Sequence, residues 1–312
     1  MATAQVNGSN ADIEVSQATK LRRMLQDPNK LVALPGVYDG FSARVALQVG
    51  GWDGLYMTGA GTTASRLGHA DLGIATLNDM RSHAEMIANL DPSVPLVADM
   101  DTGYGGPLNV HRAVTEYIRS GVAGFHIEDQ VQSKRCGHLQ GKELVGLDVF
   151  LSRVRAASEA RRRLGSDIVI IARTDALQSY GYEESIRRLK AAVDAGADVA
   201  FLEGLTSKEM CKQVVKDMAP TPVLLNMVEH GATPTISAQE AKEMGFRMML
   251  WPLSSLAAAY VAMKAGFERL KKTGIFGTPE ELSPRFLFEV SGLKQSMEID
   301  EHAGGSAFAN GA

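Results

Sequence analysis

Eight short apolar segments alternate with longer amphipathic segments along most of the chain, and this alternation limits the fold more than any other feature. The segments between them show the period of about 3.6 residues that is typical of helices. Apolar strands that are each followed by a helix indicate a parallel sheet covered on both faces. The expected strands cover residues 31–36, 54–59, 95–101, 123–129, 167–175, 198–204, 221–228 and 246–252.

We predict that this α/β sheet closes into a (β/α)8 barrel of the TIM type. An open, doubly wound sheet is the alternative, but no phosphate-binding glycine fingerprint follows the first expected strand. We divide the chain into a flexible N-terminal lead at 1–20, a catalytic barrel at 21–274, a C-terminal helical extension at 275–300 and a flexible tail at 301–312.

Composition restricts the partners and the compartment. The chain has 312 residues and a formal net charge of −4, so it offers no basic face for nucleic acid or an anionic membrane. No apolar run approaches the length of a membrane span, and the polar N-terminal segment is unlike a signal or transit peptide. Two cysteines cannot form a disulfide framework in a chain of this length, so we expect a cytoplasmic protein.

Polar side chains follow strand after strand at the carboxyl end, where barrel enzymes place their catalytic groups. One or two such groups could be explained by a separate structural partner for each in a neighbouring loop. Polar groups at six strand ends together predict an active site. The candidates, in chain order, are Thr58, Gly59, Ala60, Asp99, Asp101, His126, Glu128, Asp129, Arg173, Asp175, Glu203 and Asn226.

Spacing suggests roles for the acidic groups. Asp99 and Asp101 are two residues apart on one expected strand, and His126 and Glu128 are two apart on the next, so each pair is expected to share a side. Three carboxylates in one pocket repel one another and favour a bound cation. Oxygen ligands favour magnesium or manganese over zinc. A loop cap for Asp99 and a packing role for His126 remain open.

The stretch KRCGH places Cys136 among Lys134, Arg135 and His138, next to Gly137. Neighbouring positive charge makes a thiolate more available. A zinc site would need more cysteines than the chain has. The thiol therefore suits either a covalent nucleophile or a proton donor to a carbanion or enolate.

KRCGH, with HIEDQ before it and ARTDA after it, resembles the isocitrate lyase and phosphoenolpyruvate mutase superfamily, in particular its short-chain 2-methylisocitrate and 2,3-dimethylmalate lyases. The likeness runs from PGVYDG to WPLSSL and includes LYMTGAGTTAS, ADLGI, ADMDTGYGG and NMVEHGATP. It implies a magnesium-dependent carbon–carbon lyase that cleaves a 2-hydroxy dicarboxylate to a 2-oxo acid and a carboxylate. It also implies a homotetramer with swapped C-terminal helices.

The resemblance also implies roles for individual residues. Asp99, Asp101 and Glu128 would hold magnesium or manganese, partly through water. Cys136 would be the acid/base on a mobile loop. The other catalytic residues implied are Lys134, His138, His126, Arg173 and Glu203, and the substrate-binding residues are Tyr56, Thr58, Gly59, Ala60, Asp71, Gly137, Asn226 and Pro252.

Two departures from the family pattern bear on the substrate. In 2-methylisocitrate lyases the cysteine segment resembles CGHRPNK, whereas here it is CGHLQGK, and the loss of a basic residue favours a dicarboxylate. In the similar oxaloacetate acetylhydrolases a serine stands at the position of Pro252, which cannot donate a hydrogen bond. We therefore expect an alkylated malate as substrate. Oxaloacetate hydrolysis remains the alternative because Ser254 and Ser255 are close, and a non-catalytic metal-binding barrel is less favoured.

Overall fold

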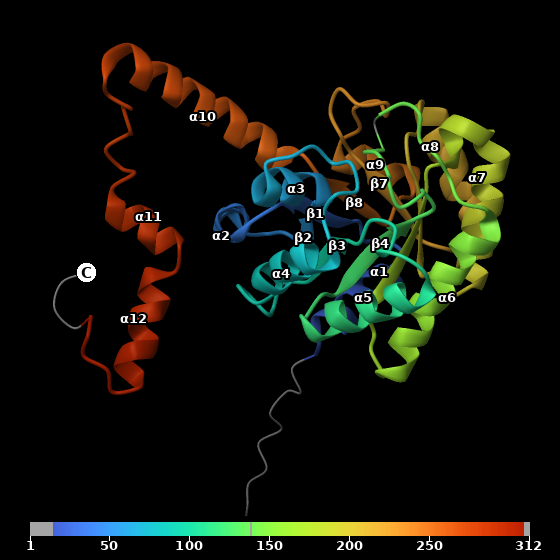
Figure 1. The fold of residues 1–312 in the computed structure, drawn as a ribbon, viewed down its shortest axis with the longest axis horizontal. Coiled ribbons are helices and arrows are strands. Elements are labelled where there is room, and N and C mark those ends of the chain that lie inside the picture. Colours follow the sequence, from blue (N-terminus) through green and yellow to red (C-terminus); the bar gives the residue numbers. More distant parts are fainter. Residues whose placement is uncertain (1–14, 138, 309–312) are drawn as a thin grey trace, which may run out of the picture.

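The computed structural model describes residues 15–137 and 139–308, and within these ranges eight parallel strands form a closed barrel (Figure 1). Each strand pairs with the next, and β8 pairs with β1, where Val32 lies opposite Met248. Closure leaves the sheet without a free edge. The fold and all eight expected strands are confirmed. The strands are β1 (Val32–Val37), β2 (Leu55–Met57), β3 (Leu96–Asp99), β4 (Gly124–Glu128), β5 (Val169–Thr174), β6 (Val199–Leu202), β7 (Val223–Asn226) and β8 (Met248–Trp251).

Helices surround the barrel, and several start at residues that cap them (Figure 1). Asp39, Thr76 and Ser237 form capping boxes at the starts of α2, α4 and α9. The helices are α1 (Gln17–Gln26), α2 (Gly40–Val49), α3 (Gly59–Leu67), α4 (Leu77–Ala88), α5 (Pro107–Arg119), α6 (Leu147–Arg163), α7 (Ala176–Asp194), α8 (Lys208–Met218), α9 (Ala238–Met244), α10 (Ser254–Thr273), α11 (Pro284–Val290) and α12 (Leu293–His302).

The inside of the barrel is filled by alternate residues of the strands. Leu34, Val97 and Leu224 belong to this apolar cluster, which also contains Leu21 and Leu25 of α1. Helix α1 therefore begins within the expected lead and packs its apolar face on the inner core of the barrel. This cluster fills the interior of the barrel. The polar residues at the strand ends therefore form a separate layer at the mouth where the carboxyl ends of the strands meet.

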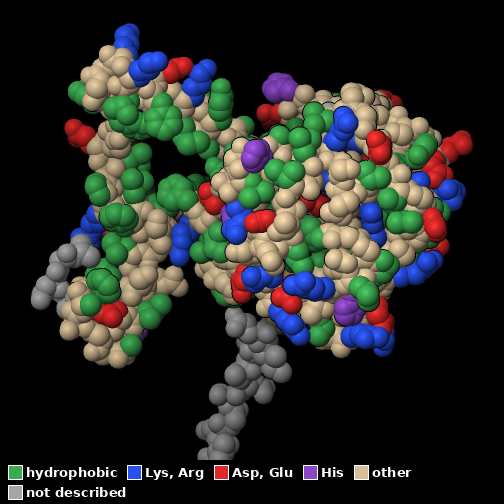
Figure 2. All heavy atoms as spheres, in the orientation of Figure 1, with side chains coloured by type: hydrophobic (Ala, Val, Ile, Leu, Met, Phe, Trp, Pro, Cys, Tyr) green, Lys and Arg blue, Asp and Glu red, His purple; other side chains and the backbone are tan. Residues whose placement is uncertain are grey.

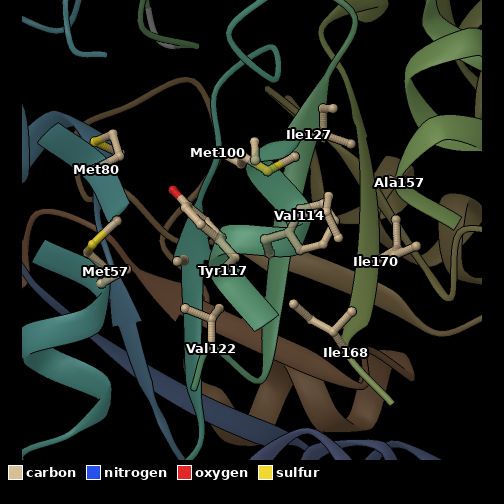
Figure 3. Close-up of a cluster of buried hydrophobic side chains, with 14 of the residues drawn as sticks. Met57, Met80, Met100, Val114, Tyr117, Val122, Ile127, Ala157, Ile168 and Ile170 are labelled. Carbon is tan, nitrogen blue, oxygen red and sulfur yellow. The ribbon is translucent and has the colours of Figure 1, made fainter. Parts of the chain in front are cut away.

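A second apolar layer lies between the sheet and its helices (Figure 3). Met57 and Ile127 of the sheet belong to the same buried cluster as Val114 and Tyr117 of α5. The hydroxyl of Tyr117 donates a hydrogen bond to the carbonyl oxygen of Asp99 at 2.7 Å. This bond joins the outer core to a strand end that carries a candidate site residue.

Helix α10 leads away from the barrel, and α11 returns to contact α2. Helices α10 to α12 are called the C-terminal arm below (Figure 1). In α10 the only described residue that is buried is Gly266, and within α11 and α12, as described, none is. The arm thus begins at Ser254, before the expected boundary at 274, and α12 continues to His302. Over the described ranges, no helix is both long and apolar enough to cross a membrane.

Candidate active site

A cavity of about 40 Å³ lies at the C-terminal mouth of the barrel. This volume has room for a few water molecules at most. Its lining contains most of the predicted site residues together with Val228 and Leu253, which the sequence did not indicate. The lining residues are Tyr56, Thr58, Ala60, Asp71, Asp99, Cys136, Gly137, Arg173, Glu203, Asn226, Val228, Pro252 and Leu253.

Seven further predicted residues that the structure describes are absent from the lining: Gly59, Asp101, His126, Glu128, Asp129, Lys134 and Asp175. Of these, Asp101, His126, Glu128 and Lys134 are buried and in contact with residues that line the cavity or with one another. Gly59 lies directly against Asp99. His138, which the resemblance also implied, lies outside the described residues.

The two aspartates after β3 do not lie on one strand as expected. β3 ends at Asp99, and Asp101 has a φ of 46°, in the left-handed region. The Oδ1 atom of Asp99 accepts a hydrogen bond from the backbone amide of Asp101 at 2.9 Å. This local bond stabilises a turn in place of a further strand residue. The prediction of a shared strand was therefore wrong, and Asp99 does cap a loop.

The carboxylates of Asp99, Asp101 and Glu128 are buried, and burial raises the pKa of all three groups. The pKa of Asp101 is raised to about 6, so this carboxylate is mostly ionised at neutral pH. The Nζ atom of Lys134 lies 2.6 Å from Oδ1 of Asp101 and 2.7 Å from Oδ1 of Asp71. Burial lowers the pKa of Lys134, but the surrounding carboxylates outweigh burial and raise it well above 10.5, so the ammonium stays charged.

Arg173 is the second buried cation of the site. Its Nε atom lies 3.0 Å from Oδ2 of Asp175 and 3.3 Å from Oε2 of Glu128. Its Nη2 atom lies 3.5 Å from Oε2 of Glu203, which also accepts a hydrogen bond from Asn226 at 3.0 Å. These carboxylates outweigh burial and keep the guanidinium charged. The guanidinium is thereby held at the cavity wall.

His126 lies beside the cavity and contacts Tyr56. Its Nε2 atom is 2.8 Å from the hydroxyl of Tyr56, and its Nδ1 atom is 3.6 Å from Oδ1 of Asp99. Burial, with the positive charges of Arg173 and Lys134, lowers the pKa of His126 to about 3. The imidazole is therefore neutral, and it reaches the cavity through the tyrosine hydroxyl.

The first turn of α3 forms another part of the wall. Thr58 caps the helix, and its side chain accepts a hydrogen bond from the amide of Gly61. A β-carbon on Gly59 would lie 2.2 Å from Oδ2 of Asp99, so only glycine fits. Amides in the first turn of a helix favour negative charge, so this end can receive a substrate carboxylate.

The loop that follows β4 covers the cavity. The backbone amide of Cys136 donates a hydrogen bond to the carbonyl of Asp71 at 3.2 Å. A β-carbon on Gly137 would lie 2.4 Å from Nη2 of Arg173, so the backbone here packs directly on the site. Neither Cys136 nor Cys211 forms a disulfide. Cys136 lines the cavity, whereas Cys211 is buried in α8.

One side of the cavity is apolar and consists of Val228, Pro252 and Leu253. The serines that follow do not line it. The Ser255 hydroxyl donates a hydrogen bond to the carbonyl of Gly36 at 2.6 Å, and the Ser254 hydroxyl donates one to the carbonyl of Trp251 at 2.9 Å. Both hydroxyls are therefore committed to the backbone.

Oxygen atoms dominate the possible metal ligands. Among the residues that the structure describes, no group of three or more His, Cys, Asp or Glu side chains has the geometry to hold an ion directly. The buried Oε2 atom of Glu128 receives no hydrogen bond from that part of the chain, although Arg173 lies within ion-pair distance. Buried carboxylates with few direct contacts fit a hard cation that keeps several water ligands.

Comparison with known proteins finds relatives that belong to one superfamily. The family model described as phosphoenolpyruvate phosphomutase matches residues 21–271. The 2,3-dimethylmalate lyase of Eubacterium barkeri is 38% identical over 292 residues, covering 92% of this chain and 98% of that protein. A crystal structure of 2,3-dimethylmalate lyase is 62% identical, has a TM-score of 0.94, and the match covers 96% of this chain and 99% of that one.

The structure of oxaloacetate acetylhydrolase in complex with the inhibitor 3,3-difluorooxalacetate is also similar. It is 58% identical, has a TM-score of 0.92, and the match covers 94% of this chain and 99% of that one. The two enzymes are thus nearly equally similar to the chain, so similarity alone does not distinguish lyase from hydrolase.

Proposed function

Because the chain belongs to the phosphoenolpyruvate phosphomutase family, within the PEP mutase and isocitrate lyase superfamily, we propose that it is a carbon–carbon lyase acting on an alkylated malate such as 2,3-dimethylmalate. The observation that carries the proposal is the two-sided cavity. Arg173 and the start of α3 suit carboxylates, whereas Val228 and Pro252 suit an alkyl group. An isocitrate-type tricarboxylate is less well matched, since the apolar side offers its extra charge no partner.

The reaction is a redox-neutral cleavage of the bond between the hydroxyl-bearing carbon and its neighbour. The hydroxyl gives its proton to a carboxylate at the cavity wall, for which Glu203 is placed. The hydroxyl-bearing carbon becomes the carbonyl of a 2-oxo acid, and the bonding electrons pass to the neighbouring carbon as an enediolate. Cys136 then donates a proton to that carbon, which leaves as a simple carboxylate. Arg173 stabilises the negative charge that develops, in a site that excludes most water.

The remaining predicted residues bind and orient the substrate. The amides of Gly59 and Ala60, in the first turn that Thr58 caps, receive one carboxylate. Asn226, paired with Glu203, presents its polar group to the other end. His126 fixes the Tyr56 hydroxyl. Lys134 and Asp71 hold the start of the cysteine segment against the cavity. Because the cavity is too small for a dicarboxylate, this segment has to move for substrate to enter.

Asp99, Asp101 and Glu128 would hold magnesium or manganese, partly through water, and the cation would polarise the hydroxyl and carboxylate oxygens of the substrate. The raised pKa values of these buried groups support the assignment, because a cation offsets the cost of burying their charge.

Oxaloacetate acetylhydrolase activity is the second candidate, supported by the 58% identity to a solved hydrolase. Oxaloacetate would react as its hydrate, whose second hydroxyl needs a partner in the pocket. Pro252 offers no donor, and the hydroxyls of Ser254 and Ser255 are engaged with backbone carbonyls. These contacts favour the lyase.

We also propose that the protein assembles as a homotetramer through the C-terminal arm. Tyr260 on the arm is 62% exposed, and Phe41 and Val45 of α2 are exposed on the barrel. An arm exchanged with a neighbouring subunit would cover both surfaces, and exposed apolar patches of this kind mark association sites. Two cysteines without a disulfide are typical of a reducing compartment, which supports a cytoplasmic location.

The test is a coupled 2-oxo acid assay with 2,3-dimethylmalate, 2-methylisocitrate, isocitrate and oxaloacetate, with oxalate release measured in parallel. We expect the largest kcat/KM for 2,3-dimethylmalate, loss of turnover on chelation, and recovery with magnesium or manganese. Full activity in chelator would exclude the metal proposal. Metal binding without turnover of any of the four acids would favour a non-catalytic barrel.

A further inference from the structure

The loop after β4 carries a second buried lysine, which the mechanism above does not use. Lys142 has a side chain that is only 3% exposed. Its Nζ atom donates hydrogen bonds to the carbonyl oxygen of Gly137 at 2.7 Å and to Oδ1 of Asp175 at 2.9 Å. One ammonium group therefore joins the backbone next to Cys136 to the end of β5. We call residues 131–137 and 139–143 the cysteine loop.

Asp175 connects this lysine to the cavity wall. Its Oδ1 atom, which accepts the bond from Lys142, also accepts one from Nη2 of Arg173 at 3.1 Å. Its Oδ2 atom accepts a bond from Nε of Arg173 at 3.0 Å. The two cations therefore share one oxygen atom. Burial raises the pKa of Asp175, but Arg173 and Lys142 outweigh burial and lower it to about 2, so the shared group is ionised.

The cysteine loop is fastened on both sides of the thiol. At its base Gln130 pairs with Leu144 in an antiparallel bridge. On the earlier side, Lys134 pairs with Asp71 and Asp101. On the later side, Lys142 is the residue whose side chain reaches both the loop backbone and the barrel. The segment with Cys136 cannot lift from the cavity without breaking the Lys142 bonds.

We propose that Lys142 is a positioning residue, which holds the cysteine loop over the cavity and orients Arg173 through their shared carboxylate, Asp175. The proposal rests on the proposed function for the role of Cys136 as proton donor. Closure of the loop and placement of Arg173 are then coupled. Opening the loop removes Lys142 from Asp175, and Lys142 is one of the two cations that hold this carboxylate in place. The site is complete only when the thiol is in place.

Burying the Lys142 ammonium costs desolvation free energy, so packing alone does not explain why a lysine stands at this position. A buried ammonium requires partners for its charge, and an apolar side chain of similar length would fill the same space without that cost. Lys142→Met is therefore the informative change, since it keeps most of the length and removes the charge. Lys142→Arg keeps the charge, and Lys190→Met removes an exposed lysine of α7 as a matched control.

The first measurement is the rate at which iodoacetamide alkylates each cysteine, followed by peptide mass spectrometry. In Lys142→Met we expect Cys136 to react roughly tenfold faster, because the loop spends more time open. The buried Cys211 should keep its rate and so reports on unfolding. Lys142→Arg should restore much of the protection, and Lys190→Met should match the wild type. This measurement needs no turnover, so it tests the fastening even if the lyase assignment fails.

The second measurement is a kinetic cycle of Lys142→Met, Asp175→Asn and the double variant, with the substrate that the wild type prefers. We expect kcat to fall roughly 10- to 100-fold in Lys142→Met with a smaller change in KM, since proton delivery depends on closure. If both residues act through one link, the double variant loses little more than the worse single variant.

Unchanged alkylation of Cys136 in Lys142→Met would overturn the proposal, whatever happens to kcat. If the loss of kcat in the double variant equals the product of the losses in the two single variants, the link through Asp175 is also overturned. If Cys211 reacts faster in Lys142→Met, the change has loosened the whole barrel, and Lys142→Arg decides the matter. Failure of that variant to protect Cys136 while Cys211 stays protected would exclude a role for the lysine charge.

Discussion

The barrel mouth and the C-terminal arm differ in what each one buries. At the mouth, Lys134, Asp175 and Arg173 are buried charges, and every one has a partner within the same chain. On the arm, Tyr260 and Phe267 are large apolar side chains that remain exposed, and Figure 2 shows hydrophobic side chains gathered there. Buried charge is tolerated only when paired, and exposed apolar surface is unfavourable in water. The charges at the mouth are thus paired within one chain, whereas the arm leaves apolar surface uncovered.

Removal of the thiol should have the largest effect and should act on the mouth alone. In Cys136→Ser we expect kcat to fall by roughly 10²- to 10⁴-fold, because a hydroxyl is a much weaker acid than a thiol. Substrate KM, the thermal unfolding midpoint and the oligomeric state should stay near the wild-type values. Steady-state kinetics and differential scanning calorimetry check these outcomes. An unchanged kcat would make Cys136 a packing residue.

A charge on the arm should have the next largest effect and should act on assembly. In Tyr260→Asp we expect subunit association to weaken by ~2 kcal/mol or more, since tyrosine anchors of interfaces typically contribute this much. Light scattering coupled to size-exclusion chromatography, over a dilution series, measures the change. Lys272→Ala, an exposed change on the same helix, is the control. An unchanged dissociation profile in Tyr260→Asp would place the interface elsewhere.

A change at Pro252 should alter the choice of substrate at the mouth and leave assembly as it is. Pro252→Ser gives the pocket a hydroxyl that can pair with the second hydroxyl of hydrated oxaloacetate. Because an unpaired hydroxyl costs ~1–3 kcal/mol, the ratio of oxaloacetate to dimethylmalate kcat/KM should rise by roughly 10- to 100-fold. A wild-type protein that already prefers oxaloacetate would show that the lyase assignment is wrong.

The smallest expected effect belongs to a helix start outside the cavity lining. Thr76→Ala removes the cap of α4 and should cost ~1 kcal/mol in the free energy of unfolding, with kcat unchanged. The Thr76 hydrogen bond is the main cause that lowers the pKa of Asp79 from 3.8 to about 2. A carboxyl whose pKa is lowered in the folded state stabilises the fold at pH values above its ordinary pKa. This stabilisation is lost as the pH falls towards the lowered pKa. Urea unfolding should therefore show a smaller difference at about pH 3 than at about pH 6. A difference that grows on acidification would contradict this account.

The barrel and most of its site were predictable because both depend on short local patterns. Asp99 and Arg173 lie at strand ends, Cys136 lies on the loop that follows β4, and parallel strands bring their carboxyl ends to one mouth. The polar character of these residues contrasts with the apolar strands that precede them. That contrast is visible in the sequence without any knowledge of the packing.

The remaining features depend on contacts that local patterns do not encode. Val228 and Leu253 line the cavity, but an apolar residue at a strand end looks the same as a core residue. The pairing of Lys142 with Asp175 joins two distant segments. Helix α10 is mostly exposed, and helical periodicity does not predict the direction in which an exposed helix leaves the barrel.

The bridge between Gln130 and Leu144 has a consequence for how this scaffold can diversify. Because the chain leaves β4 and returns at nearly the same point, the cysteine loop is inserted without displacing α6. Arg153 secures that point by donating hydrogen bonds to the carbonyls of Glu128 and Gln130. Residues within the loop can therefore be exchanged or altered in number while the barrel keeps its register. Descendants or engineered variants can acquire new substrates there without having to rebuild the fold.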